Sequence, residues 1–258
     1  MVHGTHTGAL LQLLPIADIS KPHAGAWNAS KIDWLGGSIV DFQGTKALKV
    51  HHDKGSGSTA TNPKAVGGVG VRGVPKGLPI NSGGIVFAYD VWYPTGWQWA
   101  KGGKMGGSSV GVGKSSGGHH TTTGASHRVM WQIDGGAISY IYVPTGSVQP
   151  NPLLQGTKDY GFGVFKPEFA RALKIGAWNH IEIGTKLNTF TKGKPNADGW
   201  ASLTVNGVTH AINNVVWRTD PAFNLNDVFI SDFFGGPDNS PVDQSSYYAN
   251  TAVYAWKD

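Results

Sequence analysis

The stretch GASHRVMWQIDGGAISYIYVP, residues 124 to 144, contains two runs of alternating residues around an Asp-Gly-Gly turn. This pattern predicts a β-hairpin, in which side chains two positions apart share a face. The polar members of the two rows are Ser126 and Arg128 in the first strand and Tyr140 and Tyr142 in the second. A three-residue loop from Asp134 to Gly136 would place Arg128 opposite Tyr142, whereas a two-residue loop would separate the rows.

Further strand-like runs continue on both sides of this hairpin. They are SIVDFQ, KALKVHH, GGIVFAYDVWYP, NHIEIGTKL, ASLTVNGV, DVFISDFF and TAVYAWKD, separated by turn residues. Many short strands at this spacing predict an all-β fold, a two-sheet antiparallel sandwich or β-jelly roll. Only residues 165–175 have helical spacing, and the Gly/Ser/Thr-rich residues 102–126 predict a mobile surface loop. We see no linker or repeat and expect one domain over residues 1–258.

Composition narrows the class of partner. The chain has 258 residues, 38 glycines and no cysteine, and its 21 Lys and Arg against 16 Asp and Glu leave a net charge of +5 at pH 7. A positive charge favours an anionic partner. The basic residues are scattered without a nucleic-acid-binding signature, and no apolar run approaches the roughly 20 residues of a membrane helix. We therefore expect an acidic polysaccharide, with no nucleic acid and no membrane.

The N-terminal stretch ALLQLLPIA, residues 9–17, is apolar but lacks the basic start of a signal peptide. A first β-strand, or a chain from which a signal peptide has been removed, is the better interpretation. The adjacent histidine pairs in the chain are His51-His52 and His119-His120. Neighbouring strand residues point to opposite faces, so neither pair forms a good bidentate metal site. We expect no metal and no organic cofactor.

Hydrolysis of a glycoside by a sandwich-fold enzyme would need two carboxylates flanking the scissile bond. The chain has only two glutamates, Glu168 and Glu182. Glu182 alternates with Trp178 and His180, and this row either faces a sugar or forms a half-buried strand face. The second interpretation is favoured, so hydrolysis has weak support.

An ordered set of motifs carries a more specific signal. The set is Gly-Gly-Lys ending at Lys104, Ser-x-Arg at Ser126 and Arg128, Tyr-x-Tyr at Tyr140 and Tyr142, and Phe-Phe-Gly-Gly at residues 233–236. In this order the motifs resemble the family 14 polysaccharide lyases, alginate and glucuronan lyases with a β-jelly-roll fold, from about Gly84 to Trp256. The resemblance implies catalytic roles for Lys104, Ser126, Arg128, Tyr140 and Tyr142.

A polyuronate lyase cleaves by β-elimination, which needs a base for the C5 proton, a donor for the C6 carboxylate and an acid for the leaving oxygen. Arg128 suits the carboxylate because its planar fork binds two oxygens and stays charged, and Ser126 adds a donor. Our preferred assignment makes Tyr140 or Tyr142 the base and acid, with Lys104 neutralising the uronate. The reverse, Lys104 as base and a tyrosine as acid, stays open.

Four further residues are expected to bind substrate: Trp97, Trp99, His180 and Glu182. The indoles would stack on sugar rings, although packing in the core is their ordinary role. The implied enzyme is an extracellular monomer acting on a linear polyuronate, with glucuronan slightly favoured over alginate. The alternative from a different class is a non-catalytic, lectin-like module that binds acidic glycans.

Overall fold

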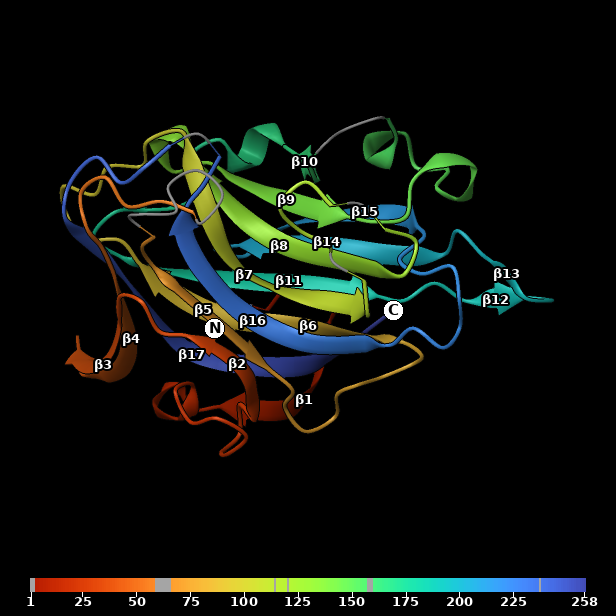
Figure 1. Cartoon of the computed structure of the whole chain (residues 1–258), viewed down its shortest axis with the longest axis horizontal. Coiled ribbons are helices and arrows are strands. Elements are labelled where there is room, and N and C mark those ends of the chain that lie inside the picture. The colour runs from red at the N-terminus through yellow and green to blue at the C-terminus, as the bar shows by residue number, and fades with distance from the viewer. Residues whose placement is uncertain (1–2, 59–65, 114, 120, 157–159, 237) are drawn as a thin grey trace.

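The computed structural model describes residues 3–58, 66–113, 115–119, 121–156, 160–236 and 238–258. Its strands form two large antiparallel sheets that stack face to face (Figure 1). The predicted all-β sandwich of the jelly-roll type is therefore confirmed. One hydrophobic cluster draws its side chains from both sheets. The expectation of one domain over the whole chain stays a prediction.

The eight-stranded sheet has the order β15-β14-β11-β6-β17-β4-β3, with β1 paired to β17. Its strands are β1 (Thr7–Leu14), β3 (Gly37–Phe42), β4 (Thr45–His52), β6 (Gly84–Trp92), β11 (Trp178–Lys186), β14 (Gly199–Val205), β15 (Val208–Val215) and β17 (Gln244–Trp256). The apolar N-terminal stretch thus contributes a strand, as predicted.

The seven-stranded sheet has the order β10-β9-β8-β7-β16-β5-β2. Its strands are β2 (Ala29–Asp33), β5 (Val69–Gly73), β7 (Gly102–Gly111), β8 (Gly124–Gln132), β9 (Ala137–Tyr142), β10 (Phe162–Val164) and β16 (Leu225–Phe234). A separate hairpin of β12 (Phe190–Thr191) and β13 (Lys194–Pro195) projects from one end of the molecule (Figure 1).

The helical segments of the described chain are single 3-10 turns. They are η1 (Ile16–Asp18), η2 (Ile133–Gly135), η3 (Gly146–Val148), η4 (Pro152–Leu154) and η5 (Pro167–Phe169). The helix predicted over residues 165–175 is wrong, because only η5 forms there. Lys166 is extended before Pro167, and Phe169 and Leu173 pack into the hydrophobic cluster. Burial of these two side chains outweighs the weak helical preference of a short segment.

Strand β7 corrects the prediction of a mobile loop over residues 102–126. It lies between β8 and β16 in the centre of its sheet, so residues 102–111 and 124–126 of the predicted loop belong to strands β7 and β8. A Cβ at Gly103 would lie 1.9 Å from the Trp131 ring, and one at Gly106 would lie 2.6 Å from the Tyr89 ring. Glycine is therefore needed here for the close approach of aromatic rings. Composition alone suggested mobility because it carries no information about such contacts.

The β8–β9 hairpin turns one residue earlier than predicted, through Ile133–Gly135. Asp134 and Gly135 both have left-handed backbones, with φ of 58° and 78°. The structure pairs Arg128 with Tyr140 and Ser126 with Tyr142, so the predicted pairing of Arg128 with Tyr142 is wrong. Since the register differs by an even number of positions, both rows keep the same face.

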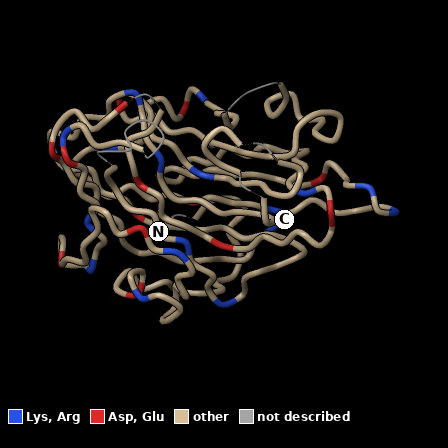
Figure 2. The backbone as a smooth tube through the Cα atoms, viewed as in Figure 1, with Lys and Arg blue, Asp and Glu red and all other residues tan. Residues whose placement is uncertain are grey.

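Alternation decides which face of the seven-stranded sheet is available to a ligand. Val129 and Trp131 of β8 are fully buried in the cluster between the sheets. His127 points the same way, with Nδ1 3.1 Å from the carbonyl oxygen of Gly184 in β11. The intervening residues Ser126 and Arg128 therefore lie on the outer face. Lys and Arg are distributed along the described backbone among Asp and Glu (Figure 2).

Candidate active site

Three adjacent strands bring the motif residues together on this outer face. Lys104 of β7 pairs with Met130 of β8, and the β8 residues pair in turn with the tyrosines of β9. The ladder between β7 and β8 has a bulge between Lys104 and Gly107, which changes the local register. Bulges often redirect a side chain beside a functional site. The predicted grouping of these five residues is the grouping that the structure shows.

Arg128 is a buried cation whose contacts are sparse. Its side chain is only 6% exposed, and Nη2 donates a long hydrogen bond of 3.4 Å to Ser126 Oγ. Within the described ranges it forms no salt bridge, and its Nε has no hydrogen-bond partner. The guanidinium carbon lies 5.0 Å from the Phe229 ring centroid. Burial and the charge of Arg72 lower the pKa of Arg128 to about 10, so it remains charged at neutral pH.

Lys104 is half-buried beside this cation. Its Nζ lies 4.5 Å from the centroid of the Tyr140 ring and 3.1 Å from Met130 Sδ. Burial, followed by repulsion from Arg128, lowers the pKa of Lys104 to about 7. A substantial fraction of this amine is therefore neutral at physiological pH and able to accept a proton.

The two phenols lie close together, with 3.5 Å between their oxygens. The backbone N–H of Gly161 donates to Tyr140 Oη at 3.0 Å, and that of Gly118 donates to Tyr142 Oη at 3.2 Å. Burial and the hydrogen bond with Tyr142 raise the pKa of Tyr140 above its ordinary value. Tyr140 therefore stays protonated well into the alkaline range, which suits an acid better than a base.

The sequence analysis missed a second arginine that lines the same site. The guanidinium carbon of Arg72, on β5, lies 4.9 Å from the centroid of the same Phe229 ring that Arg128 contacts. It pairs with Asp227 at 2.5 Å and donates to Ser109 Oγ at 2.7 Å. Both arginines line a pocket of about 270 Å³. The signal in the sequence was only an alternating VRG in a short strand, which carries no distinctive spacing.

Comparison with known proteins identifies the family of this chain. The family model described as Polysaccharide lyase 14 matches residues 41–251. The chain belongs to polysaccharide lyase family 14. The match begins well before Gly84, so the family resemblance covers more of the chain than the motifs alone indicated.

Three solved structures are similar to this chain over most of its length. Alginate lyase vAL-1 from Chlorella virus has a TM-score of 0.89 and 38% identity, with 95% of this chain and 99% of that chain covered. The marine PL-14 alginate lyase from Aplysia kurodai has a TM-score of 0.75 and 24% identity, with 97% and 99% covered. The endo-β-1,4-glucuronan lyase from Trichoderma reesei shares the fold at 15% identity and a TM-score of 0.58, with 88% and 91% covered.

A curated relative is longer than this family 14 chain. Exolysin of Paramecium bursaria Chlorella virus 1 is 30% identical over 199 residues, which are 68% of this chain. The chain covers 30% of that relative's length. Among the described residues, no helix is both long enough and apolar enough to span a membrane.

Trp97 and Trp99 lie mainly inside the hydrophobic core and not on an exposed surface where a sugar ring could stack. They are 4% and 9% exposed, and their rings lie 4.9 and 4.5 Å from that of Tyr93. Both also line a shallow pocket of about 580 Å³ beside the β8–β9 turn, together with Lys101 and Ile133. Packing is their evident role, and contact with substrate stays a prediction.

His180 and Glu182 belong to a different face of the molecule. They lie on β11 of the eight-stranded sheet, where Ile181 and Ile183 between them face the core. The structure therefore separates them from the Arg128 site, contrary to the grouping predicted from sequence. Although burial raises it, hydrogen bonds led by His180 and His3 lower the pKa of Glu182 to about 2. A carboxyl group with so low a pKa is unsuited to the general acid role of a glycosidase.

Two groups of possible metal ligands occur among the described residues. One consists of His3, His180 and Glu182, and the other of His51, Asp53 and Asp243. His52 points away from His51 and pairs with Asp232 in the interior, as strand alternation predicts. His120 of the second predicted pair lies outside the described residues.

Proposed function

We propose that this chain is a polyuronate lyase that cleaves its substrate by β-elimination at the Arg128 site. The observation that carries the proposal is a buried guanidinium that has no carboxylate partner among the residues the structure describes and that lies close to an amine whose pKa is about 7. An unpaired buried charge is costly and is retained mainly where a ligand supplies the opposite charge. A uronate carboxylate is such a ligand.

Arg128 would hold the C6 carboxylate of the sugar, with Ser126 orienting its guanidinium. The guanidinium binds two oxygens of a carboxylate in a fixed orientation. Ser126 is 1% exposed and donates its single hydroxyl proton to the carbonyl oxygen of Ser115 at 2.7 Å. Its oxygen accepts from Arg128 Nη2, so Ser126 orients the guanidinium instead of adding the donor expected from the sequence. As the C5–H bond weakens, negative charge moves onto this carboxylate, and donors already in place stabilise it.

Lys104 is the better base, which reverses the assignment that we preferred from the sequence. Its lowered pKa leaves neutral amine near pH 7, whereas the raised pKa of Tyr140 disfavours phenolate. In the reaction Lys104 takes the C5 proton, the C5–H electrons form the C4–C5 double bond, and the C4–O4 bond breaks. A tyrosine hydroxyl protonates the departing O4, and exchange with solvent restores both groups. We favour Tyr140 as this acid because Tyr142 is only 2% exposed.

The proposed substrate is alginate. The similar structures with the higher identities are alginate lyases, whereas the glucuronan lyase shares the fold at much lower identity. This support outweighs the slight lean toward glucuronan that the sequence suggested. Secretion and a monomeric state are further proposals. Detection of the protein in the medium of the cells that produce it would test the first, and light scattering of the purified chain would test the second.

The decisive experiment compares polymannuronate, polyguluronate and polyglucuronate as substrates. A lyase produces an unsaturated uronate end, so ultraviolet absorbance should increase on at least one of the three, most strongly on an alginate block. Arg128→Lys should reduce kcat/KM by about 10²-fold, because a point charge cannot reproduce the two-oxygen contact. Binding without any increase in absorbance would instead indicate the lectin-like alternative, which nothing in the family comparison favours.

A further inference from the structure

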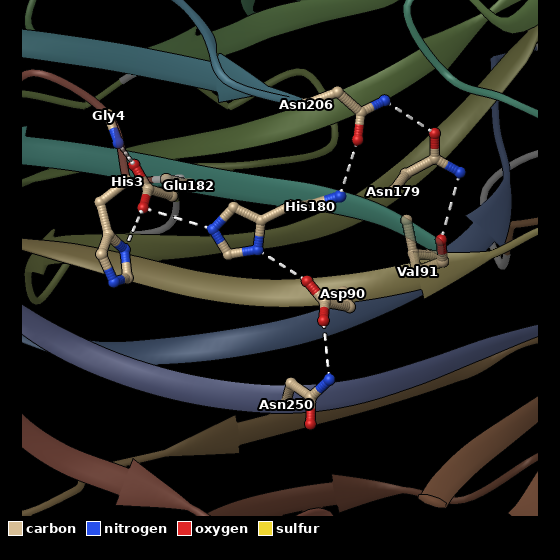
Figure 3. Close-up of polar contacts among 9 residues, drawn as sticks. All are labelled: His3, Gly4, Asp90, Val91, Asn179, His180, Glu182, Asn206 and Asn250. Atoms are coloured by element: carbon tan, nitrogen blue, oxygen red, sulfur yellow. Dashed lines mark hydrogen bonds and ion pairs between the residues drawn. The ribbon is translucent and has the colours of Figure 1, made fainter. Parts of the chain in front are cut away.

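The outer face of the eight-stranded sheet carries a cluster that polyuronate cleavage does not use. One ligand atom from each of His3, His180 and Glu182 lies within 4.8 Å of the other two (Figure 3). His3 comes from the segment before β1, whereas the other two residues alternate on β11. The cluster therefore joins the start of the described chain to a strand in the middle of the sheet.

The two oxygens of the Glu182 carboxylate have different surroundings. Thr7 Oγ1 donates to Oε2 at 2.8 Å, and the backbone N–H of Gly4 donates to the same oxygen. Oε1 faces the two imidazoles, 2.9 Å from His3 Nδ1 and 3.3 Å from His180 Nε2 (Figure 3). Glu182 is 2% exposed, so its orientation is fixed by a buried environment.

The His180 ring is oriented from its other side. Its Nδ1 lies 2.6 Å from Asp90 Oδ1, and Asn250 Nδ2 donates to Asp90 Oδ2 at 2.7 Å. A histidine that donates one N–H to a carboxylate and presents the other nitrogen to a shared centre is the common arrangement of a metal ligand. Asp90 lies on β6, which is next to β11, and Asn250 lies on β17, which is next to β6. The supporting contacts therefore come from the two strands that follow β11 in the sheet.

The spacing of the ligand atoms suits a small tetrahedral ion. Bonds of about 2.0–2.1 Å in tetrahedral geometry separate ligand atoms by roughly 3.3 Å. Glu182 Oε1 lies 3.3 Å from His180 Nε2 and 2.9 Å from His3 Nδ1, and all the ligand atoms lie within 4.8 Å of one another. The His3 side chain is 40% exposed, which gives an ion access from solvent.

We propose that His3, His180 and Glu182 form a site for a divalent transition-metal ion of the Zn²⁺ class. Two imidazoles and one carboxylate are the ligand types that Zn²⁺ accepts, with water in the fourth position. The ion replaces the direct contacts between the imidazoles and Oε1, and it cross-links the N-terminal segment to β11. Its role is to hold that segment in place, and the site lies on the opposite face of the sandwich from Arg128.

The first test measures Zn²⁺ binding to the untagged full chain after removal of metal with a chelator. Isothermal titration with ZnCl₂ should give one equivalent, and the bound protein should unfold at a higher temperature than the apoprotein. Substitution with Co²⁺ should give the intense visible bands of a four-coordinate ion. Absence of stoichiometric binding, or a six-coordinate Co²⁺ spectrum, would overturn the proposal.

Variants assign the binding to these residues. His3→Ala lies in an exposed terminal segment and should fold, but it should weaken Zn²⁺ binding at least tenfold. Asp90→Asn keeps the shape of the supporting group and should weaken binding by about 10- to 100-fold. The matched control is His6→Ala, whose ring stacks on Trp256 away from the cluster. Equal losses in His3→Ala and His6→Ala, or no loss in His3→Ala, would contradict the assignment.

Discussion

The two outer faces of the sandwich carry buried groups of opposite charge. On the seven-stranded sheet, Arg128 and Lys104 lie together, and Arg128 has no carboxylate partner among the described residues. On the eight-stranded sheet, Asp90 and Glu182 are contacted by histidine, threonine, asparagine and backbone donors. We propose that the first arrangement binds an anionic ligand and the second a cationic one. The two proposed sites then lie on opposite faces of one fold and differ in the charge of their ligands.

The largest expected effect comes from removing the proposed base on the cationic face. Lys104→Met keeps the length of the side chain but cannot accept a proton, so kcat should fall by about 10³-fold. Steady-state kinetics on alginate would measure the loss. Lys101→Met is the matched control, because the Lys101 side chain is 78% exposed. This variant should retain the activity of the unmodified enzyme. A loss below tenfold for Lys104→Met would assign the base to another group.

The two tyrosines should respond differently to the same substitution. Tyr140→Phe removes the proposed acid, and kcat should fall by about 10²-fold or more. Tyr142→Phe removes a hydroxyl that accepts from Gly118, and the loss should be about tenfold and mainly in KM. Comparison of kcat and KM for both variants is the measurement. The opposite order of losses would transfer the role of acid to Tyr142.

The pH profile should report the pKa of Lys104. Burial and Arg128 lower that pKa to about 7, and only the neutral amine takes the C5 proton. Below pH 7, kcat/KM should therefore fall about tenfold for each pH unit, while above it the rate should reach a plateau on the alkaline side. Tyr140 stays protonated there because its pKa is raised. A maximum below pH 5 would contradict a site made of amine and phenol.

Local sequence patterns predicted the fold class and the face of the hairpin, because both depend on alternation. Ser126, Arg128 and the two tyrosines share a face at any even shift of register. The error in the turn position therefore did not change the predicted face of these side chains. Lys104 was found through its motif, even though the glycines around it suggested a loop. That mistake arose because the reason for glycine lies in rings from distant strands.

The sequence could not assign His180 and Glu182 to the correct face of the sandwich. Alternation places them on one side of β11, but the side is chosen by how two sheets pack, which is a long-range property. The same limitation hid the contact between His3 and Glu182, which are 179 residues apart. Arg72 was missed for a related reason, since its partner Asp227 lies on a strand far along the chain.

The smallest expected effect on activity concerns Trp97, which distinguishes packing from sugar binding. Trp97 is 4% exposed and its ring lies 5.8 Å from Phe234 and 6.1 Å from Trp131. Trp97→Phe should lower the free energy of unfolding by about 1–2 kcal/mol through lost packing. Its KM for alginate should change less than twofold, because most of the indole faces the core. Denaturant unfolding and steady-state kinetics on one preparation would test both expectations. An increase in KM of tenfold at unchanged stability would make the pocket beside the β8–β9 turn part of the substrate path.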